Sequence, residues 1–201
     1  MKVLVACEFS GIVRDAFTAL GHDAWSCDIL PTESPGNHIQ GDVLSVLNKG
    51  WDLMIAHPPC TYLTNAGVGH LHEHVKSVNG IRAKIHGKAR WEELCKAAEF
   101  FNALKNAPIP KTAIENPIPH KYARELIGRY QQKIQPYYFD HGETKATCLW
   151  LKGLPPLMAT ILRTERHPRC HLEPPGPERA KNRSRTYAGI AKAMAEQWGT
   201  L

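Results

Sequence analysis

The sequence lacks a long hydrophobic run, paired cysteine spacing and any internal repeat. No stretch approaches the roughly 20 apolar residues of a transmembrane helix, so we expect no association with a membrane. The six cysteines are scattered without the spacing of a disulfide framework, which favours reduced thiols in a cytoplasmic protein. The apolar start ends at Glu8 and is too short for a signal peptide, so it predicts a buried first strand.

Composition and charge favour one folded domain over residues 1–201. A hydrophobic fraction of 43% supports a core and argues against global disorder. The net charge of +6 is uneven: residues 1–60 hold three Lys/Arg and seven Asp/Glu, whereas residues 161–192 hold eight Lys/Arg and three Glu. An acidic first part with a basic later part suits a neutral or cationic cofactor at one end and a polyanion at the other. An ordinary solvated basic loop remains the alternative.

Short apolar stretches alternate with helical spacing along the chain. Strands are predicted at residues 3–7, 22–28, 51–56, 112–114 and 148–151, with a further short element at 38–43, and helices at 12–20, 90–104 and 188–198. This rhythm predicts an α/β fold with a mostly parallel central sheet and helices on both faces. Residues 65–89 are expected to form a mobile surface segment, and residues 164–184 an extended loop.

The polar candidates follow these strands. In open α/β sheets, ligands bind outside the carboxyl ends of the strands. The groups concerned are Phe9-Ser10-Gly11, Asp28, Asp42, His57 to Cys60 and Glu115.

The most specific pattern runs from Asp52 to Gly67. An apolar strand leads into Pro58-Pro59-Cys60, followed by Thr64 and then Ala66-Gly67. Two prolines fix the backbone and present the next side chain rigidly. This pattern resembles the catalytic motif of the cytosine-C5 DNA methyltransferase family, and the resemblance continues from residue 3 to about residue 195.

The resemblance implies a mechanism. Cys60 would add to C6 of cytosine as a nucleophile. Glu115, within Ile114-Glu115-Asn116-Pro117, would hold N3 of the pyrimidine, and Lys145 gives the cationic match to the motif that precedes a later strand. The Rossmann-like methyltransferase fold is implied as well. Two departures are His57, where the family more often has a small residue, and Pro117, where it has Val.

S-adenosyl-L-methionine is the cofactor that the resemblance implies. The loop Phe9-Ser10-Gly11 would pass close to its methionine part, with glycine allowing close backbone approach. The remaining implied cofactor contacts are Asp28 for the ribose, Asp42 for the adenine amino group, Pro58 of the catalytic motif, and Ser184 and Thr186 near the methionine carboxylate. Asp28 or Asp42 could instead be a helix cap or a surface charge.

DNA, duplex or single-stranded, is the implied partner. A base in a duplex would have to be flipped out. Thr64 and the basic residues Arg179, Arg183 and Arg185 would contact the nucleic acid, with a salt-sensitive affinity. Family members insert a target recognition domain, but here a short basic loop, residues 153–182, takes its place. Specificity is then low, supplied by a partner protein, or directed at a small or single-stranded substrate.

Several alternatives stay open. The chain could be a catalytically silent nucleic-acid-binding relative, or keep the nucleophile and act on a free pyrimidine nucleotide or RNA. Amino methyltransferases are disfavoured, because Cys60 stands where they have an aromatic residue. The groups His70-x-His72-x-His74 and His167-x-x-Cys170-His171 lack paired zinc spacing, so solvated histidines are the default and no metal is expected. The compact size suits a bacterial or phage enzyme.

Overall fold

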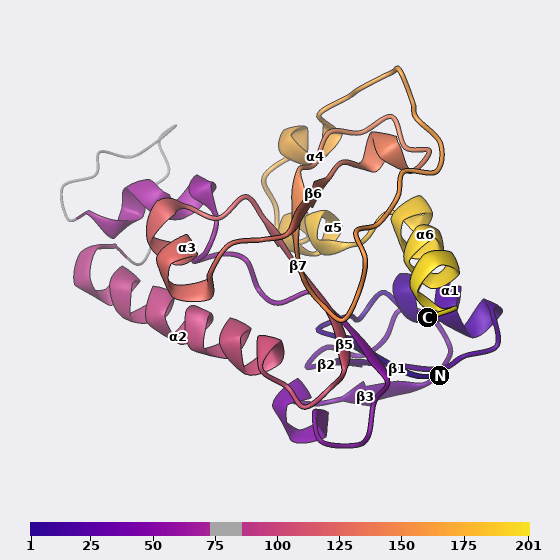
Figure 1. Ribbon diagram of the computed structural model, residues 1–201. Coiled ribbons are helices and arrows are strands. Elements are labelled where there is room, and N and C mark those ends of the chain that lie inside the picture. Colours follow the sequence, from indigo (N-terminus) through magenta and orange to yellow (C-terminus); the bar gives the residue numbers. More distant parts are fainter. Residues whose placement is uncertain (73–85) are drawn as a thin grey trace.

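A computed structural model describes residues 1–72 and 86–201 of the chain (Figure 1). Its described strands form one seven-stranded sheet in the order β3-β2-β1-β4-β5-β7-β6. The strands are β1 (Lys2–Ala6), β2 (Asp23–Asp28), β3 (His38–Gln40), β4 (Leu53–Ala56), β5 (Lys111–Pro117), β6 (Gln132–Ile134) and β7 (Thr147–Lys152). The strands β1 to β5 pair in parallel, and β7 runs antiparallel to both β5 and β6.

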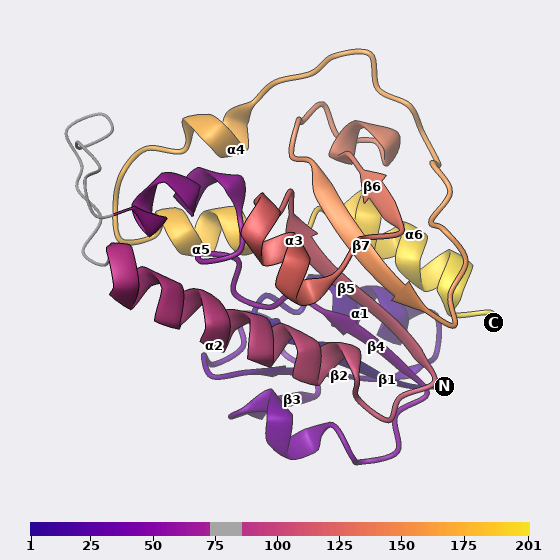
Figure 2. The ribbon, with the colours of Figure 1, turned by 60° about the vertical axis from the view of Figure 1, so that its left-hand side comes forward.

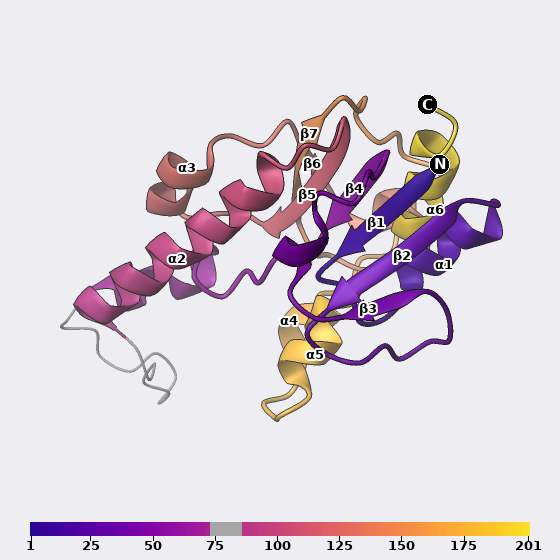
Figure 3. The same cartoon turned by 90° about the horizontal axis from the view of Figure 1, so that it is seen from below.

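The helices cover both faces of this sheet. The longer ones are α1 (Ile12–Ala19), α2 (Gly87–Lys105), α3 (Lys121–Ile127) and α6 (Ala188–Trp198), and the shorter ones are α4 (Arg169–Leu172) and α5 (Arg179–Ser184). Seen from below, α1 and α6 lie on one side of the sheet, and α2 and α3 lie on the other (Figure 3). This arrangement confirms the α/β fold expected from the sequence, with a mostly parallel central sheet and helices on both faces. Across the described residues, no helix has the length and apolar character needed to cross a membrane.

Alternation along the central strands explains the two layers of core. In β1, Val3 and Val5 pack with α1 and α6, whereas Leu4 and Ala6 pack on the side of α2. Successive side chains of a strand point to opposite faces, and both faces here are covered. The continuous apolar runs of these strands are therefore buried throughout.

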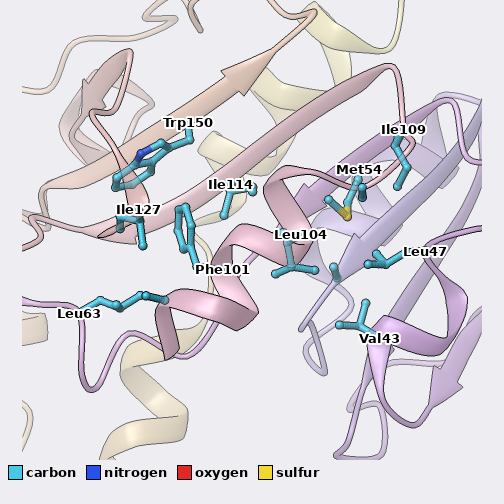
Figure 4. Close-up of a cluster of buried hydrophobic side chains, with 14 of the residues drawn as sticks. Val43, Leu47, Met54, Leu63, Phe101, Leu104, Ile109, Ile114, Ile127 and Trp150 are labelled. Atoms are coloured by element: carbon cyan, nitrogen blue, oxygen red, sulfur yellow. The ribbon is translucent and has the colours of Figure 1, made fainter. Parts of the chain in front are cut away.

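The helix α2 supplies much of one layer. Its buried positions include Leu94, Ala98, Phe101 and Leu104, which matches the face that helical spacing predicts. Phe101 meets Trp150 of β7 edge-on, with 5.0 Å between ring centroids (Figure 4). This contact joins the helix to the antiparallel part of the sheet.

Three expectations from the sequence need correction. The strand expected at residues 112–114 is longer and includes Glu115, Asn116 and Pro117, because β7 pairs along its whole length. Of the mobile surface segment expected at residues 65–89, residues 73–85 lie outside the described residues. Residues 65–71 form the 3₁₀ helix η2 (Asn65–Leu71), in which Leu71 is buried and its carbonyl accepts from Nε1 of Trp91. The segment 164–184 contains α4 and α5 and is not simply extended.

Further short elements were also not anticipated. Among them are α3, β6 and the 3₁₀ helix η3 (Pro136–Tyr138). A short third strand is present as expected, and it leads into the 3₁₀ helix η1 (Val43–Val46). The missed elements are short, so their periodic pattern is weak, and they are held by the neighbours they pack on.

We expect Phe101→Ala to lower the free energy of unfolding by about 3–5 kcal/mol, because it empties a fully buried site beside Trp150. Urea denaturation measures the change. Glu99→Ala, at an exposed position of the same helix, serves as the control and should change stability by less than about 0.5 kcal/mol. Equal effects of the two substitutions would contradict this account of the core.

Candidate active site

One edge of the sheet gathers the groups singled out in the sequence. Strand register pairs Ala6 with Ala56, Ala56 with Ile114, and Pro117 with Thr147. The carboxyl ends of β1, β4 and β5 therefore lie beside the start of the antiparallel β7. Loop residues after β1 and β4 meet the end of β5 and the segment before β7 at this edge.

The segment after β4 carries Cys60 in a tight turn. The carbonyl of Cys60 accepts hydrogen bonds from the amides of Leu63 (3.1 Å) and Thr64 (3.2 Å). Pro58 is buried and Pro59 is exposed. The two prolines constrain the backbone before Cys60, and this turn constrains the backbone after it.

His120 ties this turn to α3. Its Nδ1 accepts from the amide of Ala123 (3.0 Å), so its Nε2 donates to the carbonyl of Tyr62 (3.0 Å). The His120 amide also donates to the carbonyl of Leu63 (3.1 Å). Sequence reasoning missed His120, because the short helix α3 that it begins was not anticipated.

Arg90 of α2 supports the same turn from below. Its Nη2 donates to the carbonyl of Thr61 (3.0 Å), and its guanidinium lies 4.7 Å from the ring centre of Tyr62. A Cβ at Gly67 would collide with the Arg90 guanidinium. The glycine of the catalytic pattern is thus explained by packing. Thr64 is half-buried just ahead of η2, and its contact with nucleic acid stays a prediction.

His57 and Glu115 form an ion pair across β4 and β5. Nδ1 of His57 lies 3.0 Å from Oε1 of Glu115, with side-chain exposures of 8% and 17%. The distance suits an ion pair, although the angle is not that of a directed hydrogen bond. Burial alone would lower the pKa of His57, but the Glu115 carboxylate, together with Glu8, raises it above the ordinary value. Burial would raise the pKa of Glu115, but the His57 charge, helped by Lys145, lowers it.

The Cys60 thiol is poised between opposing charges. Burial raises its pKa above the ordinary value, the positive charge of Lys145 acts in the other direction, and the negative charge of Glu115 raises the pKa further. Arg183 adds a smaller lowering effect. Thiolate formation at this site therefore depends on the two cations.

Lys145 links this edge of the sheet to residues 183–185. Its Nζ donates to the carbonyls of Arg183 (2.8 Å) and Arg185 (3.5 Å). Its ammonium group is thus anchored on backbone while its charge acts on Cys60, His57 and Glu115. The structure therefore brings together the three residues predicted to be catalytic: Cys60, Glu115 and Lys145.

The loop after β1 is organised by Glu8, which the sequence analysis did not single out. Its carboxylate accepts from the amides of Val13 (2.7 Å) and Arg14 (3.2 Å), and from the hydroxyl of Ser10 (3.2 Å). These amides belong to the first turn of α1, where a negative charge is stabilised by the helix dipole. Glu8 thereby fixes the loop against the start of the helix.

Gly11 has a packing role of its own in this loop. Its φ is +77°, and a Cβ there would lie 2.5 Å from Nη2 of Arg14. Arg14 is fully buried and donates to Ser26 and to the carbonyls of Ser34 and Pro35. Gly11 is thus required by the arginine that joins α1 to the 32–35 loop. Its approach to a cofactor stays a prediction.

The two acids expected at the cofactor lie at neighbouring strand ends. Asp28 is half-buried at the end of β2, and its carboxylate accepts from the amide of Leu30 (2.9 Å). Asp42 is exposed and caps η1 through the amide of Leu44 (3.0 Å), which is the alternative role left open for it. Burial is the main cause of a raised pKa for the Cys7 thiol, and the charges of Asp28 and Asp42 raise it further. The two carboxylates therefore lie in the same region around Cys7.

The segment before α6 folds back over the β1 loop. Arg185 makes two contacts with the Glu33 carboxylate, at 2.7 and 3.0 Å, and Lys181 lies 2.8 Å from the same group. Both cations lie over the ring of Phe9, at 5.9 and 5.5 Å. Arg185 is therefore already paired within the chain.

The other predicted residues of this segment are less engaged. Ser184 is exposed and donates to the carbonyl of Lys181 (2.8 Å), while Thr186 and Arg179 are half-buried. Nε of Arg183 is buried and has no hydrogen-bond partner among the described residues. The cofactor and nucleic-acid roles of these side chains stay predictions.

Metal ligands were also considered. Within residues 1–72 and 86–201, no three His, Cys, Asp or Glu side chains lie together as a metal ion would require. His70 and His72 are in this part of the chain, whereas His74 lies outside the described residues. All six cysteines are free thiols.

Comparisons with known proteins give structural likenesses but no family. No family model matches the chain, and no curated protein matches it significantly. Among solved structures, a crystal structure of a candidate DNA modification methyltransferase encoded within a prophage of E. coli shares 14% sequence identity, with a TM-score of 0.46. The similarity covers 80% of this chain and 51% of that chain, so this chain spans about half the length of that protein.

We expect Gly11→Ala to destabilise the protein without any cofactor present, because of its left-handed φ and the close Arg14 guanidinium. The matched control is Gly50→Ala, at φ +69° with no atom within 4 Å of the added Cβ. Urea denaturation should show a loss of about 1–2 kcal/mol for Gly50→Ala, and at least about 1 kcal/mol more for Gly11→Ala. Similar losses of stability for the two substitutions would show that the close approach to Arg14 adds no cost at Gly11.

The Glu33 network predicts a pH-dependent contribution to stability. Hydrogen bonds from Arg185, then Lys181, lower the pKa of Glu33 to about 2. A carboxylate with a lowered folded pKa contributes stability above its unfolded pKa and loses it as pH falls. The free energy of unfolding of the wild type should therefore exceed that of Glu33→Gln by up to about 1 kcal/mol at neutral pH. The difference should shrink between about pH 4.5 and 2. A difference that is constant with pH in urea denaturation would argue against the pairing.

Proposed function

We propose that this chain transfers a methyl group from S-adenosylmethionine to C5 of cytosine in DNA, with Cys60 as the covalent nucleophile. The gathering of Cys60, Glu115 and Lys145 at one sheet edge carries the proposal. These residues come from three separate segments, and their charges act on one another in a buried setting. A nucleophile, a carboxyl group and a cation are the groups that addition to a pyrimidine requires.

The chemistry starts at the thiol. C5 of cytosine is a poor nucleophile, and addition of the Cys60 thiolate to C6 turns the ring into an enamine that is reactive at C5. The new S–C6 bond places negative charge toward N3, which is protonated by way of the Glu115 carboxyl group. After C5 has been methylated, loss of the C5 proton and cleavage of the S–C6 bond release Cys60 and restore the aromatic ring.

The residues present fit S-adenosylmethionine, which when bound supplies an electrophilic methyl group on a sulfonium. Two carboxylates, Asp28 and Asp42, stand at adjacent strand ends and suit ribose and adenine donors. The buried Nε of Arg183 lacks an acceptor in the described structure and suits a carboxylate. Phe9 and Ser10 would border the cofactor beside them, with Pro58, Ser184 and Thr186.

The positive charges near Cys60 have a direct role in this proposal. Burial opposes ionisation of the thiol, while Lys145 and Arg183 favour it. The backbone carbonyls that hold Lys145 come from the segment that folds over the β1 loop. Cofactor binding and thiolate formation would therefore depend on the same segment.

Target recognition would rest on the segment between β7 and α5. Figure 2 shows this stretch arching away from the sheet before it returns through α4 and α5. It is largely exposed and includes Arg163, Arg166 and Arg169. A basic segment without its own core suits contact with phosphates and limited base reading. Single-stranded DNA, RNA and free nucleotides therefore belong in the test.

The test is methyl transfer from radiolabelled S-adenosylmethionine to duplex DNA, single-stranded DNA, RNA and dCTP in parallel. We expect label in DNA and its loss in Cys60→Ala, by a factor on the order of 10⁴ or more. Cys95→Ala, which removes an exposed thiol of α2, is the control and should retain activity.

Three results would count against the proposal. Label found only in RNA or only in dCTP would show that DNA is not the substrate. Full activity in Cys60→Ala would exclude the covalent mechanism. Label in none of the four substrates would favour a nucleic-acid-binding relative. A stable adduct between Cys60 and DNA containing 5-fluorocytosine is expected, because fluorine at C5 blocks the final elimination.

A further inference from the structure

His57 is a buried group that the mechanism above does not use. It follows Ala56 of β4, and Glu115 follows the partner residue Ile114 of β5, so strand register places the two side chains next to each other. The result is the 3.0 Å contact between Nδ1 and Oε1. The carboxyl group assigned to the pyrimidine is thus in direct contact with an imidazole.

Charged groups from three elements face this imidazole. Glu115 of β5 and Glu8 of the β1 loop favour the protonated form, whereas Lys145, ahead of β7, opposes it. Burial also opposes it, yet the net effect is a raised pKa for His57 and a lowered pKa for Glu115. The proton of the pair therefore resides on the histidine.

The second nitrogen of His57 distinguishes it from a packing residue. Nε2 is buried and makes no hydrogen bond within the part of the chain that the structure describes. An imidazole used only for packing would be expected to have both nitrogens satisfied. Here one nitrogen is committed to Glu115, and the ring is held by the constrained backbone of the Pro58-Pro59 segment.

We propose, on the basis of the function proposed above, that His57 is a positioning residue that holds Glu115 and supplies the proton that Glu115 passes to N3 of the target pyrimidine. As the S–C6 bond forms, the Nδ1–H bond of His57 breaks, and its proton passes through the Glu115 carboxylate to form N3–H. His57 is then neutral and Glu115 is again a carboxylate. The proton returns by the same route when Cys60 leaves and the ring regains aromaticity.

The proton transfer from His57 through Glu115 predicts a specific pH dependence for adduct formation. Adduct formation needs Cys60 as thiolate, which high pH favours, and His57 in its protonated form, which is lost as pH rises through its raised pKa. The alkaline limb of the rate profile should therefore coincide with the titration of His57. Without the imidazole, the limb should move away from that value, because Glu115 has to carry the proton alone.

The experiment combines NMR titration with adduct kinetics. In protein carrying ¹⁵N-labelled histidine, His57 is assigned from the signal lost in His57→Asn. We expect it to titrate above the ordinary value of about 6.5 in wild type, and lower in Glu115→Gln. If His57→Asn does not fold, His57→Gln provides the assignment, so the wild-type titration can still be read.

The rate of adduct formation with 5-fluorocytosine DNA is then measured against pH for wild type and His57→Asn. We expect the maximal rate to fall by about 10²-fold, with the alkaline limb displaced and DNA affinity little changed. His22→Asn, which alters a histidine before β2 at the opposite edge of the sheet, is the matched control and should keep the wild-type profile.

The outcomes separate the two proposals. Absence of both methyl transfer and adduct in wild type overturns the proposed function. Methyl transfer by wild type together with an unchanged alkaline limb in His57→Asn overturns the role of His57 alone. A wild-type His57 that titrates below 6.5 also overturns that role, whatever the enzyme does.

Discussion

The antiparallel pairing of β7 with β5 positions most of the site. Its register runs from Thr112 opposite Lys152 to Pro117 opposite Thr147, which extends β5 through Glu115 and brings the start of β7 to the carboxyl edge of the parallel strands. Lys145, just ahead of β7, is thereby held beside groups that follow β4. A parallel strand at this place would put its amino end at the far edge of the sheet.

This constraint also explains the electrostatics of the edge. A thiol, a carboxylate and an imidazole lie together, and their charged forms would be unfavourable there without a compensating charge. The ion pair of His57 with Glu115 and the nearby Lys145 provide that compensation. The same arrangement gives Cys60 cations that favour its thiolate, so the packing of the site and its proposed chemistry have one physical origin.

The opposite side of the site is built on hydrogen bonds around α1. Glu8 caps the helix, Arg14 joins it to the 32–35 loop, and Glu33 fastens the segment of Lys181 and Arg185 over Phe9. These contacts fix the region where the cofactor is proposed to bind. They also give several motif residues a structural task, which shows why a motif by itself does not distinguish packing from ligand contact.

The sequence by itself determined the α/β class, the helices α1, α2 and α6, and the segment that presents Cys60. Local periodicity and two prolines encode those features within a few residues. Tertiary structure decided that Glu115 lies inside a strand, that His57 meets it, that Glu8 caps a helix, and that Arg185 pairs with Glu33 across 152 positions. Such contacts depend on strand order and register, and because spacing along a single chain does not specify which charged groups become neighbours, they were beyond sequence reasoning.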